Sequence, residues 1–431
     1  MERNEVIART VLGYLSEAGA DQGVCVAGSG TKTEFYYESG KLGMLRTVSN
    51  VSVSVKALVG NRKGTASVNS FEEVDLRRAV TEAVEAARVS QDDPAEGLPE
   101  EIAVESFEKG PLTPDPETML KLITEFFDEL SEKYPAVSVD SASIDHSVSE
   151  SVYCASNGIC LTSKQGAYSF SPMFMCREGD NTSSFNYYGA VFNETEAPLI
   201  DLAGGRSIIE DSLKQITPAP FAGKFTGDVI LTPSCFGSLL GSVEGNFLSD
   251  GALLEGTSIW KDAIGTQVAS PSFHWSSRPR SEEIAGGYFT TEGYVAQNMD
   301  IIRDGVLKNF VLGRYAAKKT GLPRSVSGGG CYFVDAGDVG LNDMISSVKQ
   351  GLLVGRFSGG EPSSDGTFSG VAKNSFAIRD GKICEAVNEV MISGNLASML
   401  KDISAISRER INDGDSCLPW VKVGGVTVSG Q

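Results

Sequence analysis

Histidine, the residue that most often holds zinc and moves protons, is nearly absent from the sequence. Only His146 and His274 occur among the 431 residues, too far apart for one helix to present both to a metal ion. A Ser-His-Asp triad would have to use one of them, yet no Gly-X-Ser-X-Gly turn follows a predicted strand. The alternating run around His146 favours a surface or satisfied sheet residue over a ligand, and the context of His274 favours a loop. The sequence therefore offers no catalytic residue.

Positive charge, long apolar runs and paired cysteines are also scarce. The 56 acidic residues outnumber the 37 Lys and Arg, and the formal charge of -19 repels nucleic acid and anionic lipid. We therefore expect no direct nucleic-acid partner. No stretch approaches the ~18 apolar residues of a membrane span, and acidic residues within MERNEVIARTVLGYL argue against a signal peptide, so we expect no membrane contact. Eight cysteines without a CxxC pair favour buried thiols in a cytoplasmic protein.

Hydrophobic periodicity predicts an α+β fold, in which an N-terminal mixed α/β domain precedes a large, mostly antiparallel β domain with packed helices. We assign residues 1–90 to the N-terminal domain and the acidic, Pro- and Gly-containing stretch 91–112 to a linker. A central α+β domain at 113–218 and a C-terminal β-rich domain at 219–431 follow. A linker of this composition should be the first site of limited proteolysis.

Helical spacing of apolar residues places helices at the start of the chain, between Ser70 and Ser90, and at about 115–133, 198–215, 234–247 and 343–350. We interpret Ser70 to Glu73 as a capping box, Asn342 as an N-cap and Gly351 as the glycine that ends its helix. These assignments rest on local pattern alone.

Three Asn-Gly or Asp-Gly pairs lie between apolar runs and predict tight hairpins, because both turn residues must tolerate positive φ. They are Asn157-Gly158, Asp304-Gly305 and Asp380-Gly381. The last two occur in copies of IRDG, which leaves open whether the chain contains a decayed duplication or two turns that converged. The glycines at 328–330 lack the strand and helix context of a nucleotide site, so we expect a flexible loop there.

Several strings, in order along most of the chain, resemble the TldD/PmbA family. They are VSVSVKALVGNRKGTASVNSFEEVDLRRAVTEAVEAAR, GTSIWKDAIGTQVASP, IIRDGVLKNFVLGRYAAKKTGLPR, FSGGEPSSDGTFSGVAKNSFAIRDGKICEAVNEVMISGN and GGVTVSG. The resemblance implies a cytoplasmic protein related to metallopeptidases that act in proteolysis or maturation of small, unfolded peptides.

The resemblance also bears on metal binding, since the family has two kinds of member. One kind, TldD, carries HExxxH on a helix before the GTS string and a zinc-binding cysteine near its C-terminus; the other, PmbA or TldE, lacks the motif and acts as its partner. Here the HExxxH positions fall at about Gly241, Ser242 and Asn246, which cannot hold zinc. Cys417 lies near the place of the zinc cysteine, but Leu418 follows it where metal-bearing members have glycine. The resemblance implies a PmbA-like chain with no catalytic residue and no metal of its own.

Two hypotheses about function remain. The first is a non-catalytic subunit that forms a dimer with a TldD-like, zinc-bearing chain and holds an extended peptide; a homodimer is the alternative assembly. The second is a free-standing peptide- or protein-binding regulator of the gyrase-modulator type. Peptide-contacting residues cannot be identified from the sequence. A basic cluster fits a solvated helix face or an acidic partner surface; it comprises Arg314, Lys318, Lys319 and Arg324.

Overall fold

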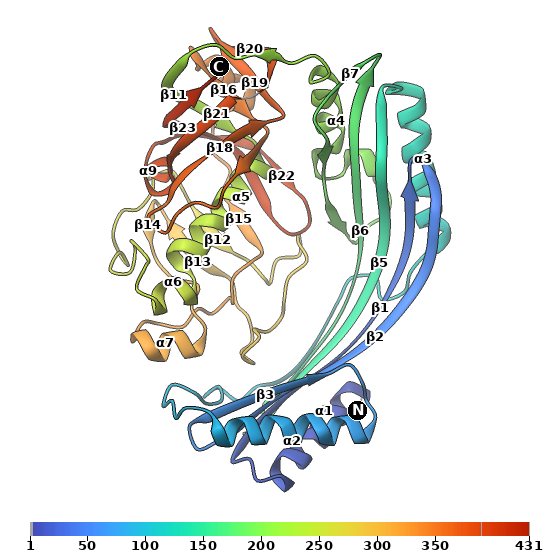
Figure 1. Cartoon of the computed structure of the whole chain (residues 1–431), viewed down its shortest axis with the longest axis vertical. Helices are drawn as coiled ribbons and strands as arrows, with labels where there is room; N and C mark the ends of the chain where they lie inside the picture. The colour runs from blue at the N-terminus through green and yellow to red at the C-terminus, as the bar shows by residue number, and fades with distance from the viewer. Residues whose placement is uncertain (1–2, 389, 431) are drawn as a thin grey trace.

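The computed structural model describes residues 3–388 and 390–430, and its strands form two large sheets (Figure 1). The first sheet has the order β3-β2-β1-β5-β6-β4, with three short strands added to β6. Its strands are β1 (Gln22–Glu38), β2 (Lys41–Val59), β3 (Arg62–Val68), β4 (Val104–Lys109), β5 (Val137–Ala155), β6 (Cys160–Glu178), β7 (Asn181–Thr182), β8 (Asn186–Tyr187) and β9 (Ala190–Phe192).

Four long, curved strands of this sheet, β1, β2, β5 and β6, run from the lower end of the molecule to its upper right in Figure 1. Two helices, α1 (Arg3–Glu17) and α2 (Glu73–Val89), pack on their lower ends. A third, α3 (Pro116–Lys133), packs on their upper ends. Its start is set by Asp115, whose carboxylate accepts the Thr118 N–H over 3.0 Å. The helices at the two ends of these strands therefore cover two separate apolar cores.

The predicted division near residue 90 does not separate two sheets. β1 pairs with β5 without interruption from Val24 to Glu38, so strands from residues 1–90 and 113–218 share one sheet. The intervening stretch 91–112 contributes β4, which runs parallel to β6. The shared sheet could not be predicted from local composition, because pairing between distant strands does not depend on the composition of the segment between them.

The second sheet begins at Ala219 and has mixed strand orientation. Its main path is β10-β20-β19-β16-β11-β23-β15-β12-β13-β14, with β17, β18, β21 and β22 branching from it. The strands are β10 (Ala219–Pro220), β11 (Lys224–Leu231), β12 (Trp275–Ser277), β13 (Met299–Arg303), β14 (Val306–Leu307), β15 (Tyr332–Val334), β16 (Gln350–Val354), β17 (Arg356–Gly359), β18 (Thr367–Lys373), β19 (Ser375–Arg379), β20 (Lys382–Asn388), β21 (Val390–Asn395), β22 (Ile403–Asn412) and β23 (Cys417–Ser429).

Short helices pack around this second sheet and form the C-terminal body on the left of Figure 1. They are α5 (Pro233–Val243), the π-helical turn η2 (Glu244–Leu248), α6 (Asp250–Leu254), α7 (Arg314–Thr320), α8 (Leu341–Ser346) and α9 (Leu396–Lys401). The 3-10 helix η1 (Leu199–Gly204) and α4 (Gly205–Lys214) precede the body and lie against the first sheet. The predicted α+β class, with an N-terminal mixed part and a β-rich C-terminal part, is confirmed.

All three predicted glycine hairpins form. Asn157-Gly158 joins β5 to β6, and the two IRDG turns join β13 to β14 and β19 to β20. Asp304 and Asp380 adopt φ of 52° and 47°, which explains why each is followed by glycine. The glycines at 328–330 all have positive φ and lie in a loop, as expected.

Three predicted helix ends are wrong. The helix expected at 343–350 begins at Leu341 and ends at Ser346, because the chain turns into β16 and Gly351 pairs with Asp228 of β11. Asn342 is therefore inside the helix and does not cap it. The capping box at Ser70 does not form either, since its hydroxyl accepts the N–H of Glu72 instead. Local polar turns compete with caps in this way.

The predicted basic cluster and the predicted linker bind each other. Arg314 Nη1 donates to the carbonyl of Ala95 over 2.9 Å, and Lys319 Nζ lies 2.9 Å from Asp93. The Lys319 ammonium lowers the pKa of the Asp93 carboxyl to about 2. The segment predicted as a linker is thus docked on α7, whose basic residues pair with its acidic residues while Lys318 and Lys319 remain exposed to solvent.

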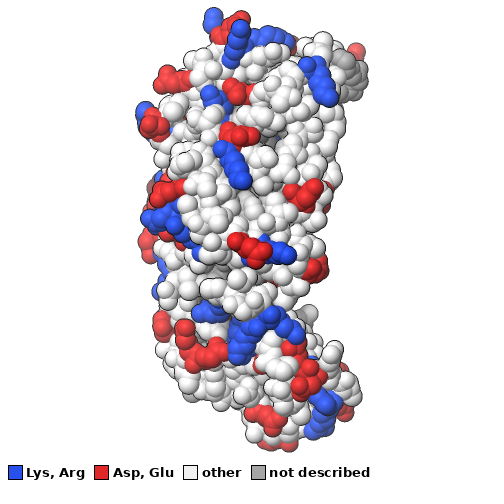
Figure 2. All heavy atoms as spheres, turned by 90° about the vertical axis from the view of Figure 1, so that its left-hand side faces the viewer, with Lys and Arg blue, Asp and Glu red and all other residues white. Residues whose placement is uncertain are grey.

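Charges are interspersed on the face of the C-terminal body that Figure 2 shows. Lysine and arginine side chains alternate there with aspartate and glutamate over a surface that is mostly uncharged. No broad basic area covers this face, in keeping with the net charge. Within the described residues, no helix combines the length and the apolar character that crossing a membrane requires.

Candidate functional site

The helix expected to carry the family's metal motif forms as α5, directly after β11. Thr232 caps it: its hydroxyl accepts the Cys235 N–H over 3.3 Å and donates to the Gly355 carbonyl over 2.8 Å. Pro233 follows at the first helical position, where its fixed φ suits a helix start. The cap therefore sets the start of α5 and also ties the helix to the strand that follows β16.

The two faces of α5 and η2 differ sharply. The predicted apolar face is confirmed, because every member of it is almost fully buried in the core of the C-terminal body: Leu239, Leu240, Val243 and Phe247. The opposite face carries Gly241, Ser242, Gly245 and Asn246, and the two glycines are exposed. A Cβ added at either glycine would meet nothing within 4 Å. The face is open because these side chains are small.

That open face forms one wall of a groove of about 730 Å³. The other wall is the end of β17 and the turn after it, residues 357–362. Asn246 spans the groove at one point, where its side-chain amide donates to the Pro362 carbonyl over 3.3 Å. Gly241, Ser242 and Asn246, the three positions predicted to correspond to the metal motif, all line this groove.

β17 is an edge strand along this groove. It pairs antiparallel with β18, and no other strand within the described residues pairs with it. The Cys235 thiol of α5 lies against the backbone N–H of Phe357, so the helix covers the start of the free edge. Beyond that point Ser358, Gly359 and Gly360 are exposed. An unpaired strand edge beside a groove can accept an extended peptide by backbone hydrogen bonding.

A second hollow, of about 420 Å³, meets the groove at Ser238, which lines both. Its walls come from both halves of the chain: Tyr187 and Tyr188 at the first sheet, Ser234 and Gly237 on α5, and residues around Leu418. The groove thus continues from the exposed side of α5 towards the interface between the two sheets.

The donors present do not fit zinc. Gly241 offers no ligand, Ser242 offers a neutral hydroxyl, and the Asn246 amide is engaged by Pro362. Zinc takes histidine, thiolate or carboxylate ligands. No cluster of three such side chains capable of holding a metal occurs within residues 3–388 and 390–430.

Cys417 does not join the groove. It is buried beside Phe333 and Ile284, whereas its neighbour Leu418 packs into the core beneath α5 and lines the second hollow. Alternation along β23 accounts for this opposite orientation. Burial raises the pKa of the Cys417 thiol, which favours the protonated form over a metal-binding thiolate.

Glu244 lies in sequence between the predicted motif positions Ser242 and Asn246, at the start of the π-helical turn. Burial raises its pKa, and the neighbouring Tyr332 hydroxyl acts in the opposite direction. Burial likewise raises the pKa of Tyr332. Glu244 is thus held in a poorly solvated setting behind the open face of the helix.

The two histidines lie apart and do not meet at the groove. His146 is buried in the first sheet, where Nε2 lies 2.7 Å from the Pro111 carbonyl, so the prediction of a satisfied sheet residue is confirmed. His274 precedes β12, with Nε2 3.0 Å from Asp300 and Nδ1 2.9 Å from Asp335. Both of its ring nitrogens are therefore engaged.

Sequence reasoning found the helix wall of the groove but not the wall opposite it. The string FSGGEP at 357–362 stood among the family-like segments without a role. Its adjacent glycines, at the end of an apolar run, were the available signal for an exposed strand edge. Arg356 and the aromatic residues Phe185 and Tyr187 were also missed, because they approach one another only in the folded chain.

Comparisons with known proteins agree with this arrangement. Residues 223–430 match the family model described as the PmbA/TldA metallopeptidase C-terminal domain. The metalloprotease PmbA of Escherichia coli O157:H7 is 24% identical over 387 residues, which cover 85% of this chain and 84% of that protein.

Two solved structures have the same fold. TldE from Thermococcus kodakarensis has a TM-score of 0.85 and 19% identity, and the match covers 98% of this chain and 99% of that one. A candidate modulator of DNA gyrase from Bacteroides thetaiotaomicron has a TM-score of 0.88 and 21% identity over 100% of both chains. Sequence strings, family model and fold agree, and residues 223–430 of the chain belong to the PmbA/TldD metallopeptidase family.

Proposed function

We propose that this chain is the metal-free subunit of a cytoplasmic two-subunit peptidase, in which the zinc belongs to a TldD-like partner. The observation that carries the proposal is the groove between α5 and β17. The three positions that hold a metal motif in metal-bearing relatives line it, and here they are Gly241, Ser242 and Asn246. The helix keeps its cap and its buried apolar face, which supports a structural role.

The role of the chain is to hold an extended peptide while the partner cleaves it. The free edge of β17 supplies backbone donors and acceptors, which bind peptides of varied sequence. Enclosure by two subunits excludes water and folded proteins from the reacting bond. A small, unfolded peptide is therefore the substrate class that the groove suits.

Association tests this proposal. The purified chain and a metal-bearing family member from the same source should co-elute as a heterodimer at micromolar concentration, and native mass spectrometry should find zinc only in the partner. Separate elution at those concentrations would instead favour a free-standing peptide- or protein-binding regulator of the gyrase-modulator type. A stoichiometric metal ion in this chain alone would contradict the metal-free assignment.

A further inference from the structure

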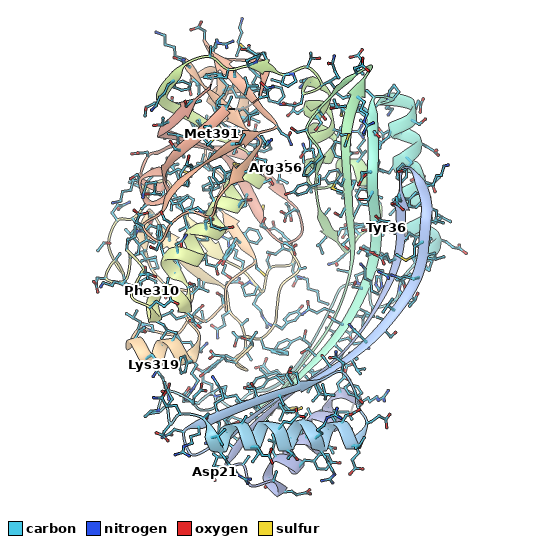
Figure 3. The ribbon with its side chains drawn as sticks, in the orientation of Figure 1. Asp21, Tyr36, Phe310, Lys319, Arg356 and Met391 are labelled. Carbon is cyan, nitrogen blue, oxygen red and sulfur yellow. The ribbon has the colours of Figure 1, made fainter. Side chains whose placement is uncertain are left out.

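Arg356, the first residue of β17, crosses from the C-terminal body towards the first sheet. Its guanidinium carbon lies 4.9 Å from the ring centre of Phe185 and 5.3 Å from that of Tyr187. The two rings stack on each other, with centroids 6.5 Å apart. Figure 3 shows Arg356 on the side of the body that faces the curved sheet. The rings of Phe185 and Tyr187, next to the first sheet, thus orient the guanidinium of Arg356, which belongs to the C-terminal body.

The donors of this cation are not all satisfied by its neighbours. Its Nε is buried without a hydrogen-bond partner, and no carboxylate within the described residues forms an ion pair with its guanidinium. Acidic residues outnumber basic ones by 56 to 37 in this chain, so an unpaired, half-buried arginine is unexpected. A guanidinium has five N–H donors, and leaving buried donors unsatisfied costs free energy. An incoming anion would remove that cost.

Arg356 stands where the groove and the second hollow approach each other. Tyr187, against which it packs, lines the second hollow. Ser358, two residues along β17 and so on the same face of the strand, lines the groove. A chain that binds the exposed edge at Ser358 and continues over this face of the strand would therefore pass from the groove to the guanidinium.

Other charges near this route leave the arginine available. Asp413 lines the second hollow, but its carboxylate accepts the backbone N–H groups of Asp415 and Ser416 over 3.0 and 2.7 Å. Lys373 is the cross-strand partner of Arg356 on β18, so the second nearby charge is also positive. The positive charge of Lys373 favours an anion at this place.

We propose that Arg356 anchors a carboxylate of the bound peptide, either the C-terminal carboxylate or the side chain of an aspartate or glutamate. The planar guanidinium matches a carboxylate through two parallel hydrogen bonds, and the aromatic rings fix its plane. The anchor would set the position of the peptide relative to the partner's zinc. This inference rests on the proposed peptide-holding function and specifies its ligand chemistry.

Binding of labelled peptides to the heterodimer tests the anchor. A chelator removes the partner's metal so that no cleavage occurs. Three versions of one unstructured decapeptide are compared by fluorescence anisotropy: a free C-terminal carboxylate, a C-terminal amide, and the amide with one internal glutamate. We expect the free carboxylate to bind about 10- to 100-fold more tightly than the plain amide. The third version shows whether a side-chain carboxylate serves equally.

Variants separate the anchor from general folding. Arg356→Gln should abolish the preference for the carboxylate, and Arg356→Lys should restore it only in part, because an ammonium lacks the planar fork. Tyr187→Leu should weaken the preference while the charge stays. Arg303→Gln is the matched control, since Arg303 already pairs with Asp300. Thermal unfolding of each variant shows that it folds.

The outcomes distinguish the two proposals. Equal binding of carboxylate and amide by the unchanged protein would overturn the anchor while peptide holding stands. An unchanged preference in a folded Arg356→Gln variant would do the same. If none of the three peptides binds the assembled heterodimer, both the anchor and the peptide-holding function fail.

Discussion

Arg314 Nε donates a hydrogen bond to Glu100 Oε1 over 3.2 Å. The contact joins α7 of the C-terminal body to the segment that follows α2, and Lys318 lies 3.1 Å from the same carboxylate. Ala95 and Leu98 of that segment are buried. A stretch whose composition is typical of a flexible linker is thus fixed in place by charges more than two hundred residues away.

This contact predicts resistance to proteolysis. Limited proteolysis should leave residues 91–101 intact, whereas an exposed acidic linker would be cut. Arg314→Met should make the segment accessible to the protease. The substitution leaves the Ala95 carbonyl without its donor and removes one of the donors to Glu100, at a cost of about 1–3 kcal/mol. Mass spectrometry of the fragments locates the cuts. Arg379→Met is the control, because Arg379 pairs with Glu385 within one hairpin. Early cutting at 91–101 in the unchanged protein would contradict this account.

Filling the groove should block peptide binding without harming the fold. Gly241→Trp places an indole where an added Cβ meets nothing within 4 Å, and it should weaken peptide binding on the order of tenfold, the effect of about 1.4 kcal/mol of lost contact. Gly241→Ala should keep binding and add about 0.5–1 kcal/mol of helix stability.

Gly13→Trp is the control for this substitution, since Gly13 is an exposed position of α1 where an added Cβ also meets nothing within 4 Å. Phe247 is unsuitable as a test position, because it is fully buried in the core and an aspartate there would unfold the protein. Undiminished peptide binding by Gly241→Trp would show that the peptide lies elsewhere.

We predict that the stability difference between the Glu244→Gln variant and the unchanged protein depends on pH. Burial raises the pKa of Glu244 above the ordinary value of 4.5, so its ionisation is less favourable in the folded than in the unfolded chain. The resulting loss of stability is absent below the unfolded pKa and grows as the pH rises through the folded pKa. The neutral variant Glu244→Gln should therefore raise Tm at pH 8 and change it little at pH 4.

Glu385 provides a control of opposite sign. The Arg379 guanidinium lowers the pKa of the Glu385 carboxyl, so the stability it contributes is present above the unfolded pKa and lost as the pH falls through the folded pKa. Glu385→Gln should accordingly lower Tm at pH 8. Calorimetry at the two pH values compares the variants, and a uniform effect of Glu244→Gln across pH would refute the explanation by burial.

The cysteines predict a single fast-reacting thiol. Cys384 is exposed, Cys331 is half-buried and the other six are buried. Burial raises the pKa of Cys25 and of Cys235 to about 12, which suppresses the reactive thiolate. Ellman's reagent should titrate one thiol rapidly in the native chain and all eight in urea, and Cys384→Ser should remove the fast phase. Rapid reaction of Cys417 would show that its pocket is open.

Features that depend on neighbouring residues could be predicted from the sequence, whereas features that depend on contacts between distant residues could not. Asn157-Gly158 fixes a hairpin through its own backbone, and Asp115 caps α3 three residues away, so both features were accessible to local pattern. The helix wall of the groove was likewise found. The wall at 357–362 and the docking of Arg314 on Glu100 depend on contacts across more than a hundred residues. Such contacts leave no local signal, and for that reason the docking of residues 91–101 on α7 was not predicted.

Reconstitution of peptidase activity tests the central claim most directly. The metal-bearing family member is assayed on an unstructured peptide alone, with this chain, and with its Gly241→Trp and Gly13→Trp variants. The account predicts that the unchanged chain and Gly13→Trp switch on cleavage, that Gly241→Trp does so poorly, and that this chain alone cleaves nothing. Equal activity of the metal-bearing member with and without this chain would contradict the account.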